Sequence, residues 1–449
     1  MEADRRKAIF EDLPVRQAVC RQIVPAIASQ LIILLYNLAD AYFVGMLNRP
    51  EQTAALTVST SAFLMLTAIS NLFGVGGASA MARARGRREP DRAKRLSAVS
   101  FWGGLASGLV YAAAVALFSR QILTLCGATA DTLSTAARYV RWTVVIGGPF
   151  SVMSMLLSNL IRAEGRAAAA SFGVMLGCVL NILLDPLFVL PRFLGMGAEG
   201  AGLATAISNM TAVAYFLLCL LRRKKDTVIT VFPGPLPEPG GLVKEVLSVG
   251  FPSALQYALT VVAVAAQARF VSHYATEAVA ALGIMKKLDY LPMYFAIGLS
   301  NGLLPLLAYS HGAGLHRRRR EAFRFGAAVS VTFAVVCLVV YELFAPQLSG
   351  LFIDDPLTIR YCAAFLRRTV VAMPLMAFCY PMVIQFQAMG RARESLIISV
   401  LRKGVLDIPL LALTDYLLPL YGCMWVQPIV DTAALTVSLW LYRRLPKET

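Results

Sequence analysis

Long runs of apolar residues, separated by short polar stretches, make up most of the chain. A helix needs about 20 mostly apolar residues to cross the hydrocarbon core of a bilayer. Runs of that length occupy residues 20–47, 53–82, 96–119, 136–160, 169–190, 200–221, 245–272, 278–308, 323–345, 363–388, 395–416 and 422–442. The pattern therefore predicts an all-α polytopic membrane protein with twelve transmembrane helices.

The composition agrees with a membrane protein. Of the 449 residues, 58% are hydrophobic and only 15% are charged, whereas soluble domains carry about 25% charged residues. The eight cysteines are scattered singly, mostly inside apolar runs, so we expect no disulfide framework. The net charge of +16 could suggest nucleic-acid binding, but the basic residues gather in short loops between the apolar runs. We therefore expect no nucleic-acid partner.

The distribution of these basic loops predicts the orientation. Basic clusters such as "RARGRREPDRAKR", "RRKK" and "HRRRR" follow the second, sixth and eighth runs, and "DRRK" precedes the first. All of them fall on one side of an even-numbered topology, and basic loops mark the cytoplasmic side. We expect a multi-pass protein of the cell membrane with both termini in the cytoplasm.

The two halves of the chain resemble each other. "VPAIASQLIILLYNLADAYFVG" from Val24 pairs with "FPSALQYALTVVAVAAQARFVS" from Phe251, and "RAEGRA" pairs with "QAMGRA". The Pro/Gly-rich stretch 226–241 separates them. These features predict an amino lobe over residues 1–222, a cytoplasmic linker over 223–243 and a carboxyl lobe over 244–449. Two pseudo-symmetric six-helix lobes around a central cleft are a recurrent transporter design.

Polar residues of the amino lobe converge at one depth in the predicted membrane. Asp40 lies in the outer part of the first span, because a helix rises about 1.5 Å per residue from the cytoplasmic side. The same measure places Asp185, Asn181 one turn before it, and Thr205 at a similar depth on two other helices. Tyr139 lies at the outer start of the fourth span.

These acids have no lysine or arginine deep within the same spans, so they should hold a cation or share a proton. A helix cap or a bond to a neighbouring helix is the simpler explanation for one such acid. The convergence of two acids, an amide and a hydroxyl favours function.

The segments "LYNLADAYFVG", "RAEGRAAAASFGVMLGCVLNILLDPLFV" and "GAEGAGLATAIS" resemble the multidrug and toxic compound extrusion (MATE) family, and its DinF-like branch most closely. The resemblance covers essentially the whole chain. It implies cation-driven efflux of amphipathic, often cationic compounds, with a coupling site at Asp40, Asn181, Asp185 and Thr205 and a tyrosine, Tyr139, nearby. It also implies a first helix that bends at Pro25.

The carboxyl lobe departs from that family. The seventh span reads "YALTVVA" where a related branch has a glutamate, and Ser310 and His311 stand where an asparagine is usual. These departures put a cation site in the carboxyl lobe in doubt. Asp407 in "RKGVLDIPLL" could form a local ion pair with Arg402 or Lys403, or it could supply a charge to the cavity.

The leading hypothesis is an antiporter that exports amphipathic cations by alternating access. We expect protons rather than sodium as the coupling ion, although carboxylates, an amide and a hydroxyl serve either. Residues that could line the substrate cleft are Tyr36, Asn37, Phe150, Met155, Gln267 and Asp407, although packing is the commoner role of such residues. We expect no cofactor, no certain metal site, membrane lipid as a partner, and a monomer.

Three other functions can be compared with this hypothesis. A flippase for a lipid-linked or amphiphilic metabolite could have the same architecture, but its cleft should be cationic. An enzyme would need a nucleophile–base pair or metal ligands inside the spans, and the three histidines lack that spacing. A channel fits poorly with two repeated lobes that differ in their acids.

Overall fold

The protein is a bundle of long helices. The computed structural model describes residues 9–47, 50–126, 128, 130–223, 226–231, 239–271 and 273–444, and every regular element within these ranges is helical. Nine of the described helices are long and apolar enough to cross a membrane, and ten spans result if one bent pair counts as a single span. The predicted all-helical, polytopic fold is confirmed. The count of twelve spans and the placement of the termini stay predictions.

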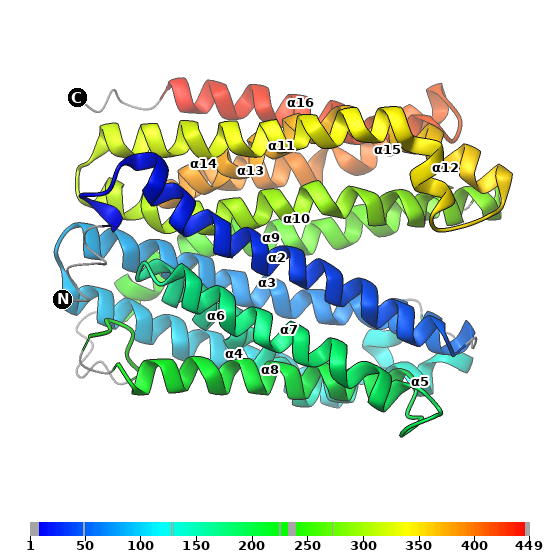
Figure 1. Ribbon diagram of the computed structural model, residues 1–449, viewed down its shortest axis with the longest axis horizontal. Coiled ribbons are helices and arrows are strands. Elements are labelled where there is room, and N and C mark those ends of the chain that lie inside the picture. Colours follow the sequence, from blue (N-terminus) through cyan, green and yellow to red (C-terminus); the bar gives the residue numbers. More distant parts are fainter. Residues whose placement is uncertain are drawn as a thin grey trace.

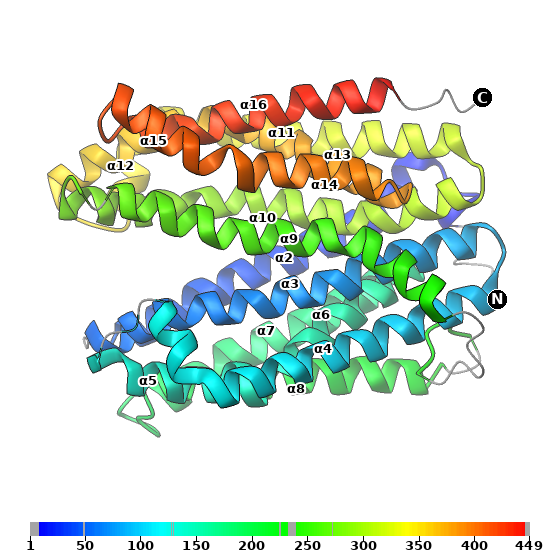
Figure 2. The same cartoon turned by 180° about the vertical axis from the view of Figure 1, so that it is seen from behind.

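The first group of helices, which we call the amino half, occupies the lower part of Figure 1. Its elements are α2 (Val15–Gly45), α3 (Pro50–Gly86), α4 (Pro90–Leu125), α5 (Ala130–Val140), the π-helical turn η1 (Arg141–Ile146), α6 (Gly148–Ala163), α7 (Ala167–Val189) and α8 (Ala198–Leu221). The long helices run roughly parallel to one another, and α2 slants across to reach the upper part of the molecule (Figures 1 and 2).

The second group, the carboxyl half, lies above it. Its elements are α9 (Pro239–Val271), α10 (Thr276–Gly312), α11 (His316–Gly350), α12 (Pro356–Thr369), the 3₁₀ turn η2 (Val370–Ala372), α13 (Met373–Ala388), α14 (Ala392–Val400), the π turn η3 (Leu401–Val405), α15 (Asp407–Leu417) and α16 (Gly422–Arg443).

Two helix starts in the carboxyl half lie at identifiable residues, and the second has a clear local cause. α9 begins at Pro239, inside the predicted linker. α12 begins after Asp355, whose carboxylate accepts bonds from the hydroxyl of Thr358 at 2.6 Å and its N–H at 2.7 Å. These bonds lower the pKa of Asp355.

The fourth, tenth and eleventh predicted spans change helix type along their length. The fourth bends by 47° between Thr132–Ile146 and Gly148–Ala163. The sequence Gly147-Gly148-Pro149 explains the bend, since proline removes a backbone donor and its ring clashes with the preceding turn. The tenth is interrupted at η2, just before Pro374, and the eleventh at η3. The apolar pattern did not reveal these changes because each run stays mostly apolar across them.

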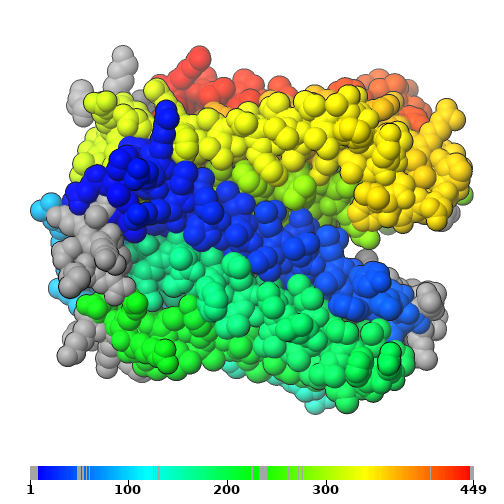
Figure 3. Space-filling model, viewed as in Figure 1, coloured from blue at the N-terminus to red at the C-terminus, as the bar shows by residue number. Residues whose placement is uncertain are grey.

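The two halves pack tightly at the end that carries Gly86 and Gly312, which we call the basic end. A Cβ at Gly250 of α9 would overlap the carbonyl of Leu72 in α3, and one at Gly312 would overlap the carbonyl of Arg83. Only glycine permits such close backbone approach. The surface is hollowed between the halves at the opposite end, on the right of Figure 3. The halves are therefore closed on each other at the basic end.

An ionic cluster ties the halves together at the basic end. Glu245 of α9 accepts from Arg92 at 2.8 Å and from Arg83 at 3.3 Å, and Arg87 lies 3.7 Å away. The three arginines belong to α3, the turn after it and α4. A cavity of about 330 Å³ adjoins Glu245, Arg83 and Arg87. These ion pairs hold the two halves together at the same end as the close glycine contacts.

The segment before α2 is also wedged between the halves at the basic end, and we call Ile9–Glu11 the amino-terminal clasp. The Phe10 ring is fully buried and stacks on the ring of Tyr309 in α10, with centroids 4.6 Å apart. The guanidinium carbon of Arg85 in α3 lies 5.5 Å from the Phe10 centroid. The Tyr309 hydroxyl donates to Glu11 at 2.6 Å. The clasp therefore contacts both halves.

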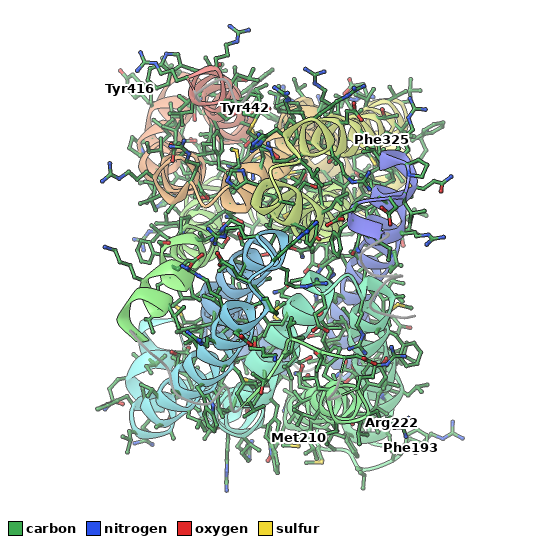
Figure 4. The ribbon with its side chains drawn as sticks, turned by 90° about the vertical axis from the view of Figure 1, so that its left-hand side faces the viewer. Phe193, Met210, Arg222, Phe325, Tyr416 and Tyr442 are labelled. Atoms are coloured by element: carbon green, nitrogen blue, oxygen red, sulfur yellow. The ribbon has the colours of Figure 1, made fainter. Side chains whose placement is uncertain are left out.

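The start of α2 extends these contacts. Figure 4 views the helices from the basic end, where Phe325 of α11 lies beside the start of α2. There the guanidinium carbon of Arg16 is 5.9 Å from the centroid of the Phe325 ring. Arg318 of α11 also donates to the carbonyl of Ile9 at 3.1 Å.

The described part of the connection between the halves is held on the amino half. Glu164, 1% exposed, accepts from the Thr227 hydroxyl and the Val228 N–H, each at 2.6 Å. Trp102 of α4 donates to the carbonyl of Val231 at 2.9 Å. Part of the predicted linker, residues 224–225 and 232–238, lies outside the described ranges.

Candidate cation-binding site

Three helices of the amino half bring the predicted polar residues together, near the end opposite the basic end. Asp40 lies near the end of α2, Asn181 and Asp185 lie one turn apart on α7, and Thr205 lies in the second turn of α8. Asp185 is 0%, Asn181 2% and Thr205 4% exposed, and Asp40 is partly buried. We call these four residues the amino-half site.

Asn181 is the bridge within this site. In one orientation of its amide, Nδ2 donates to the Thr205 hydroxyl at 3.3 Å. In the opposite orientation, which suits the neighbouring groups better, the amide donates to Asp185 Oδ2 at 3.2 Å and accepts from the Thr205 N–H at 3.1 Å. The Thr205 hydroxyl also donates to the carbonyl of Ala201 at 3.0 Å. Asn181, Asp185 and Thr205 thus form one hydrogen-bonded unit across α7 and α8.

The two carboxylates share an electrostatic environment without a fixed counterion. Asp40 and Asp185 interact electrostatically, and neither has an ion pair with a described lysine or arginine. One oxygen of each, Oδ1, is buried and has no hydrogen-bond partner among the described residues. Buried polar oxygens normally have a partner, and buried charges are normally paired. The site is therefore short of positive charge and of donors.

Two tyrosines adjoin the acids. Tyr139 of α5 and Tyr36 of α2 each interact electrostatically with both carboxylates. Tyr139 is 6% exposed and packs so closely on α8 that a Cβ at Gly202 would lie 3.0 Å from its carbonyl oxygen. The structure thus places the predicted Tyr139 beside the acids, and it adds Tyr36, which the sequence suggested only as a cleft residue.

The donor set of the site defines its chemistry. Two carboxylates, an amide and a hydroxyl are oxygen donors that suit a hard cation, and two neighbouring acids also suit a shared proton. Within the described residues, no three histidine, cysteine, aspartate or glutamate side chains group as metal ligands. The arrangement can load and release a small cation, and it holds no nucleophile–base pair.

The other predicted residues of the amino half are spread over two helices. α2 is helical through Pro25, near its start at the basic end. Asn37 donates to the Tyr294 hydroxyl of α10 at 3.2 Å, which links the halves near the acids. Phe150 is 37% exposed and Met155 is partly buried, both on α6. The structure therefore places Asn37 in contact with the facing half.

Gln267 and Asp407 lie in the carboxyl half, close to the start of α16. Gln267 donates to the carbonyl of Cys423 at 3.1 Å. Asp407, 1% exposed, accepts from the Gln427 amide at 3.0 Å, and the Gln427 carbonyl accepts from Lys403 Nζ at 2.7 Å. Asp407 thus reaches Lys403 through Gln427.

Arg402 has another partner, which the sequence reasoning missed. Its Nε donates to Asp431 of α16 at 2.7 Å, its guanidinium carbon lies 4.4 Å from the Tyr380 centroid, and both charged side chains are 2% exposed. Asp289 of α10 interacts electrostatically with Arg402 and Asp431, and Lys286 of α10 interacts with Asp289 and Asp407. The available signal was the presence of charged residues inside the apolar runs 278–308 and 422–442.

Long apolar helices in two facing halves, closed at one end and holding buried unpaired acids near the other, define a polytopic membrane transporter. The sequence profile of the MatE family matches residues 25–187 and 252–413, which is more than half of the chain. The protein therefore belongs to the MatE family. It is a multi-pass transporter of the plasma membrane and not an enzyme.

Individual relatives agree with this assignment. The chain is 27% identical over 451 residues to the multidrug export protein MepA of Staphylococcus aureus strain MRSA252, with 99% of this chain and 98% of the relative covered. It is 28% identical over 440 residues to MepA of Staphylococcus saprophyticus, with 98% and 96% covered.

Solved structures show the same fold. One described as the outward-facing conformation of a multidrug resistance MATE family transporter superposes with a TM-score of 0.90 at 24% identity, with 98% of this chain and 97% of that chain covered. Another, described as MATE in the straight conformation, gives a TM-score of 0.90 at 25% identity with the same coverage.

Proposed function

We propose that the protein is a cation-coupled multidrug exporter that works by alternating access, and that it belongs to the DinF-like branch of its family. The observation that carries the proposal is the pair Asp40 and Asp185, buried together without a counterion. Intramembrane acids of this kind mark ion and proton pathways. The similarity to MepA supports drugs as the cargo.

The proposed cycle begins with the site open to the side opposite the basic end. A cation binds between Asp40 and Asp185, with Asn181 and Thr205 as further ligands or hydrogen-bond partners, and neutralises the charge. We favour protons over sodium, because two acids that share one environment can hold a proton between them. Neutralisation repacks α2, and Pro25 is the place where this helix can bend.

The cargo follows from the sign of the site. Two acids without a base favour amphipathic cations over anions, and the electrostatic neighbours Tyr36 and Tyr139 add aromatic faces that attract organic cations. Cation and cargo must couple negatively, so that loading one releases the other. A lipid-linked anionic cargo would need a positive site instead.

The wider architecture is part of this proposal. It has an amino lobe over 1–222, a cytoplasmic linker over 223–243 and a carboxyl lobe over 244–449, in twelve spans with both termini in the cytoplasm. The separation of the halves in Figures 1 and 2, and the family profile matching once in each half, support the two-lobe division. The basic end would face the cytoplasm, and the protomer would work as a monomer.

The test is efflux of a fluorescent cationic dye from cells that express Asp40→Asn or Asp185→Asn. Each variant should insert at the wild-type level and lose export, because one coupling charge is gone. Asp354→Asn is the matched control, since Asp354 is exposed in the loop before α12. Wild-type export by Asp40→Asn would refute the coupling role.

Proteoliposomes then identify the coupling ion. Proton and sodium gradients are imposed separately on purified protein, and dye movement is followed. Movement driven by the pH gradient alone supports protons. Movement driven only by the sodium gradient would replace protons with sodium in the proposal.

A further inference from the structure

Equivalent positions in the two halves can be paired because the family profile matches each half once. Arg162 of "RAEGRA" pairs with Gln387 of "QAMGRA", a difference of 225 residues. Beyond these motifs, η3 forms a π turn in the carboxyl half, and such a turn accommodates one extra residue. Paired residues that follow η3 are therefore 226 positions apart in the chain. The ends of the two matches, residues 187 and 413, are also 226 positions apart.

This pairing gives Asn181 a counterpart. Its partner position in the carboxyl half is Asp407. Thr205 of "GLATAISN" pairs with Gln427 of "MWVQPIVD", and Asp40 pairs with Gln267 when Pro25 is aligned with Pro252. We call Gln267, Lys403, Asp407 and Gln427 the carboxyl-half site.

The contacts repeat as well as the positions. Asn181 bonds to Thr205 in the amino half, and Asp407 bonds to Gln427 at 3.0 Å in the carboxyl half. The carbonyl of Ala201, one turn before Thr205, accepts a hydrogen bond from the Thr205 hydroxyl of the same helix. The carbonyl of its counterpart, Cys423, accepts one from Gln267 of α9, so the acceptor positions match and the donors differ. The two sites therefore share one framework on the first turns of α8 and α16.

The charges differ between the two frameworks. The amino-half site holds two acids and no base. The carboxyl-half site holds one acid, Asp407, and one base, Lys403, which lies within η3, and the matching stretch of the amino half has no base. Lys403 Nζ donates to Gln427 at 2.7 Å and interacts electrostatically with Asp407. Arg402 pairs with Asp431. Lys286 interacts electrostatically with both Asp289 and Asp407, so the nearby charges of α10, one base and one acid, add no net charge.

We propose that the carboxyl-half site is a second cation site whose permanent occupant is the ammonium group of Lys403. Asp407 is 1% exposed and its Oδ2 has no hydrogen-bond partner among the described residues, so an acceptor for a cation remains in the site. The built-in ammonium keeps this half in its loaded form. Only the amino half then exchanges a coupling cation with the medium. This inference rests on the proposed role of the amino-half site.

Removal of the tethered ammonium should expose the site. In Lys403→Met, Asp407 loses the ammonium that it reaches through Gln427, while Lys286 stays offset by Asp289. A free monovalent cation or a proton should then take the place of Nζ. A ligand that binds only the folded state stabilises that state. The ratio of folded to unfolded protein rises about tenfold when the ligand is present at ten times its dissociation constant. The variant should therefore become stabilised by sodium or by acid, whereas the parent is not.

The experiment measures the thermal unfolding of the purified full chain in detergent. Sodium chloride is compared with choline chloride at equal ionic strength, and pH is then lowered at constant salt. All proteins carry Asp40→Asn and Asp185→Asn, which remove both acids of the amino-half site. We expect a rise of several degrees in the unfolding midpoint for Lys403→Met with sodium or at low pH, and none for the parent.

Two matched variants isolate the cause. Lys403→Arg keeps a cation and should stay insensitive, and Lys287→Met removes an exposed lysine of α10 and should also stay insensitive. Adding Asp407→Asn to Lys403→Met should abolish the gained sensitivity. If Lys403→Met does not fold, Lys403→Gln is used, and high sodium should rescue it.

A Lys403 variant that gains no sodium or pH sensitivity, or that no cation rescues, overturns the inference. So does an equal gain in Lys287→Met. This assay requires no transport, so its outcome is separate from the efflux test of Asp40→Asn. Loss of efflux in Asp40→Asn together with an insensitive Lys403→Met would refute the tethered cation and leave the proposed exporter standing.

Discussion

The Arg402–Asp431 pair should make a single truncation far more damaging than a double replacement. We consider Asp431→Ala. It removes the partner of a guanidinium that is 2% exposed and only 2.7 Å from the carboxylate. At an effective dielectric constant of about 20, two unit charges at that distance attract by about 6 kcal/mol. Both charges lost their hydration when they were buried, so the net value of the pair is much smaller than this attraction.

The variant leaves that desolvation cost uncompensated. Breaking a buried pair by removing one partner typically costs 3–5 kcal/mol, and Tyr380 alone cannot replace the lost charge. An unfolding entropy of about 2.1 cal/mol/K per residue amounts to about 0.9 kcal/mol/K for 449 residues. Asp431→Ala should therefore lower the unfolding midpoint by about 3–5 °C, or more if helices persist after unfolding.

Two further variants complete the assay, which follows thermal unfolding in detergent. Arg402→Met with Asp431→Leu removes both charges and should be close to wild type in stability, because apolar replacements of buried pairs are often neutral. Glu321→Ala breaks the exposed pair with Arg317, 2.9 Å apart, and should cost under about 1 kcal/mol. Equal midpoints for Asp431→Ala and Glu321→Ala would refute the reasoning.

Three other predictions concern the site and the closed end. Asp185→Ala should abolish dye efflux whereas Gln267→Ala should reduce it modestly, because only the acid carries coupling charge; equal losses would mean that the halves share coupling. Phe10→Ala should lower stability by about 3–5 kcal/mol, since a fully buried ring is lost, and thermal unfolding measures this. Gly250→Ala should reduce folded yield on gel filtration, because its methyl group would overlap the carbonyl of Leu72, and an unchanged yield would contradict the close approach.

The sequence predicted the helices better than their interruptions. Apolar run length determines whether a segment can span a bilayer, but it carries no information about a bend. The pair Gly147 and Pro149 could have indicated the break in the fourth span, since the sequence shows both residues. The π turn η3 could not be anticipated, because "LRKGV" has no residue that requires it.

The amino-half site could be approached from sequence because it depends on helical rise and spacing. Asn181 and Asp185 are four residues apart on one helix, so they share a face in any regular helix. Asp407 was harder to interpret. Its nearest charged neighbours along the chain were expected to pair with it, but Arg402 pairs with Asp431, 29 residues away on another helix. Which of two adjacent bases faces an acid depends on the local winding of η3.

The amino-terminal clasp has a practical consequence for work on this transporter. Because Phe10 is fully enclosed between the two halves, a purification tag or fluorescent protein joined close to Ile9 would compete with its seating. Deletion of the residues up to and including Glu11 would remove the clasp altogether. Such a deletion should favour the form that is open at the basic end. An antibody fragment raised against the exposed Tyr309 surface could then hold that form for imaging.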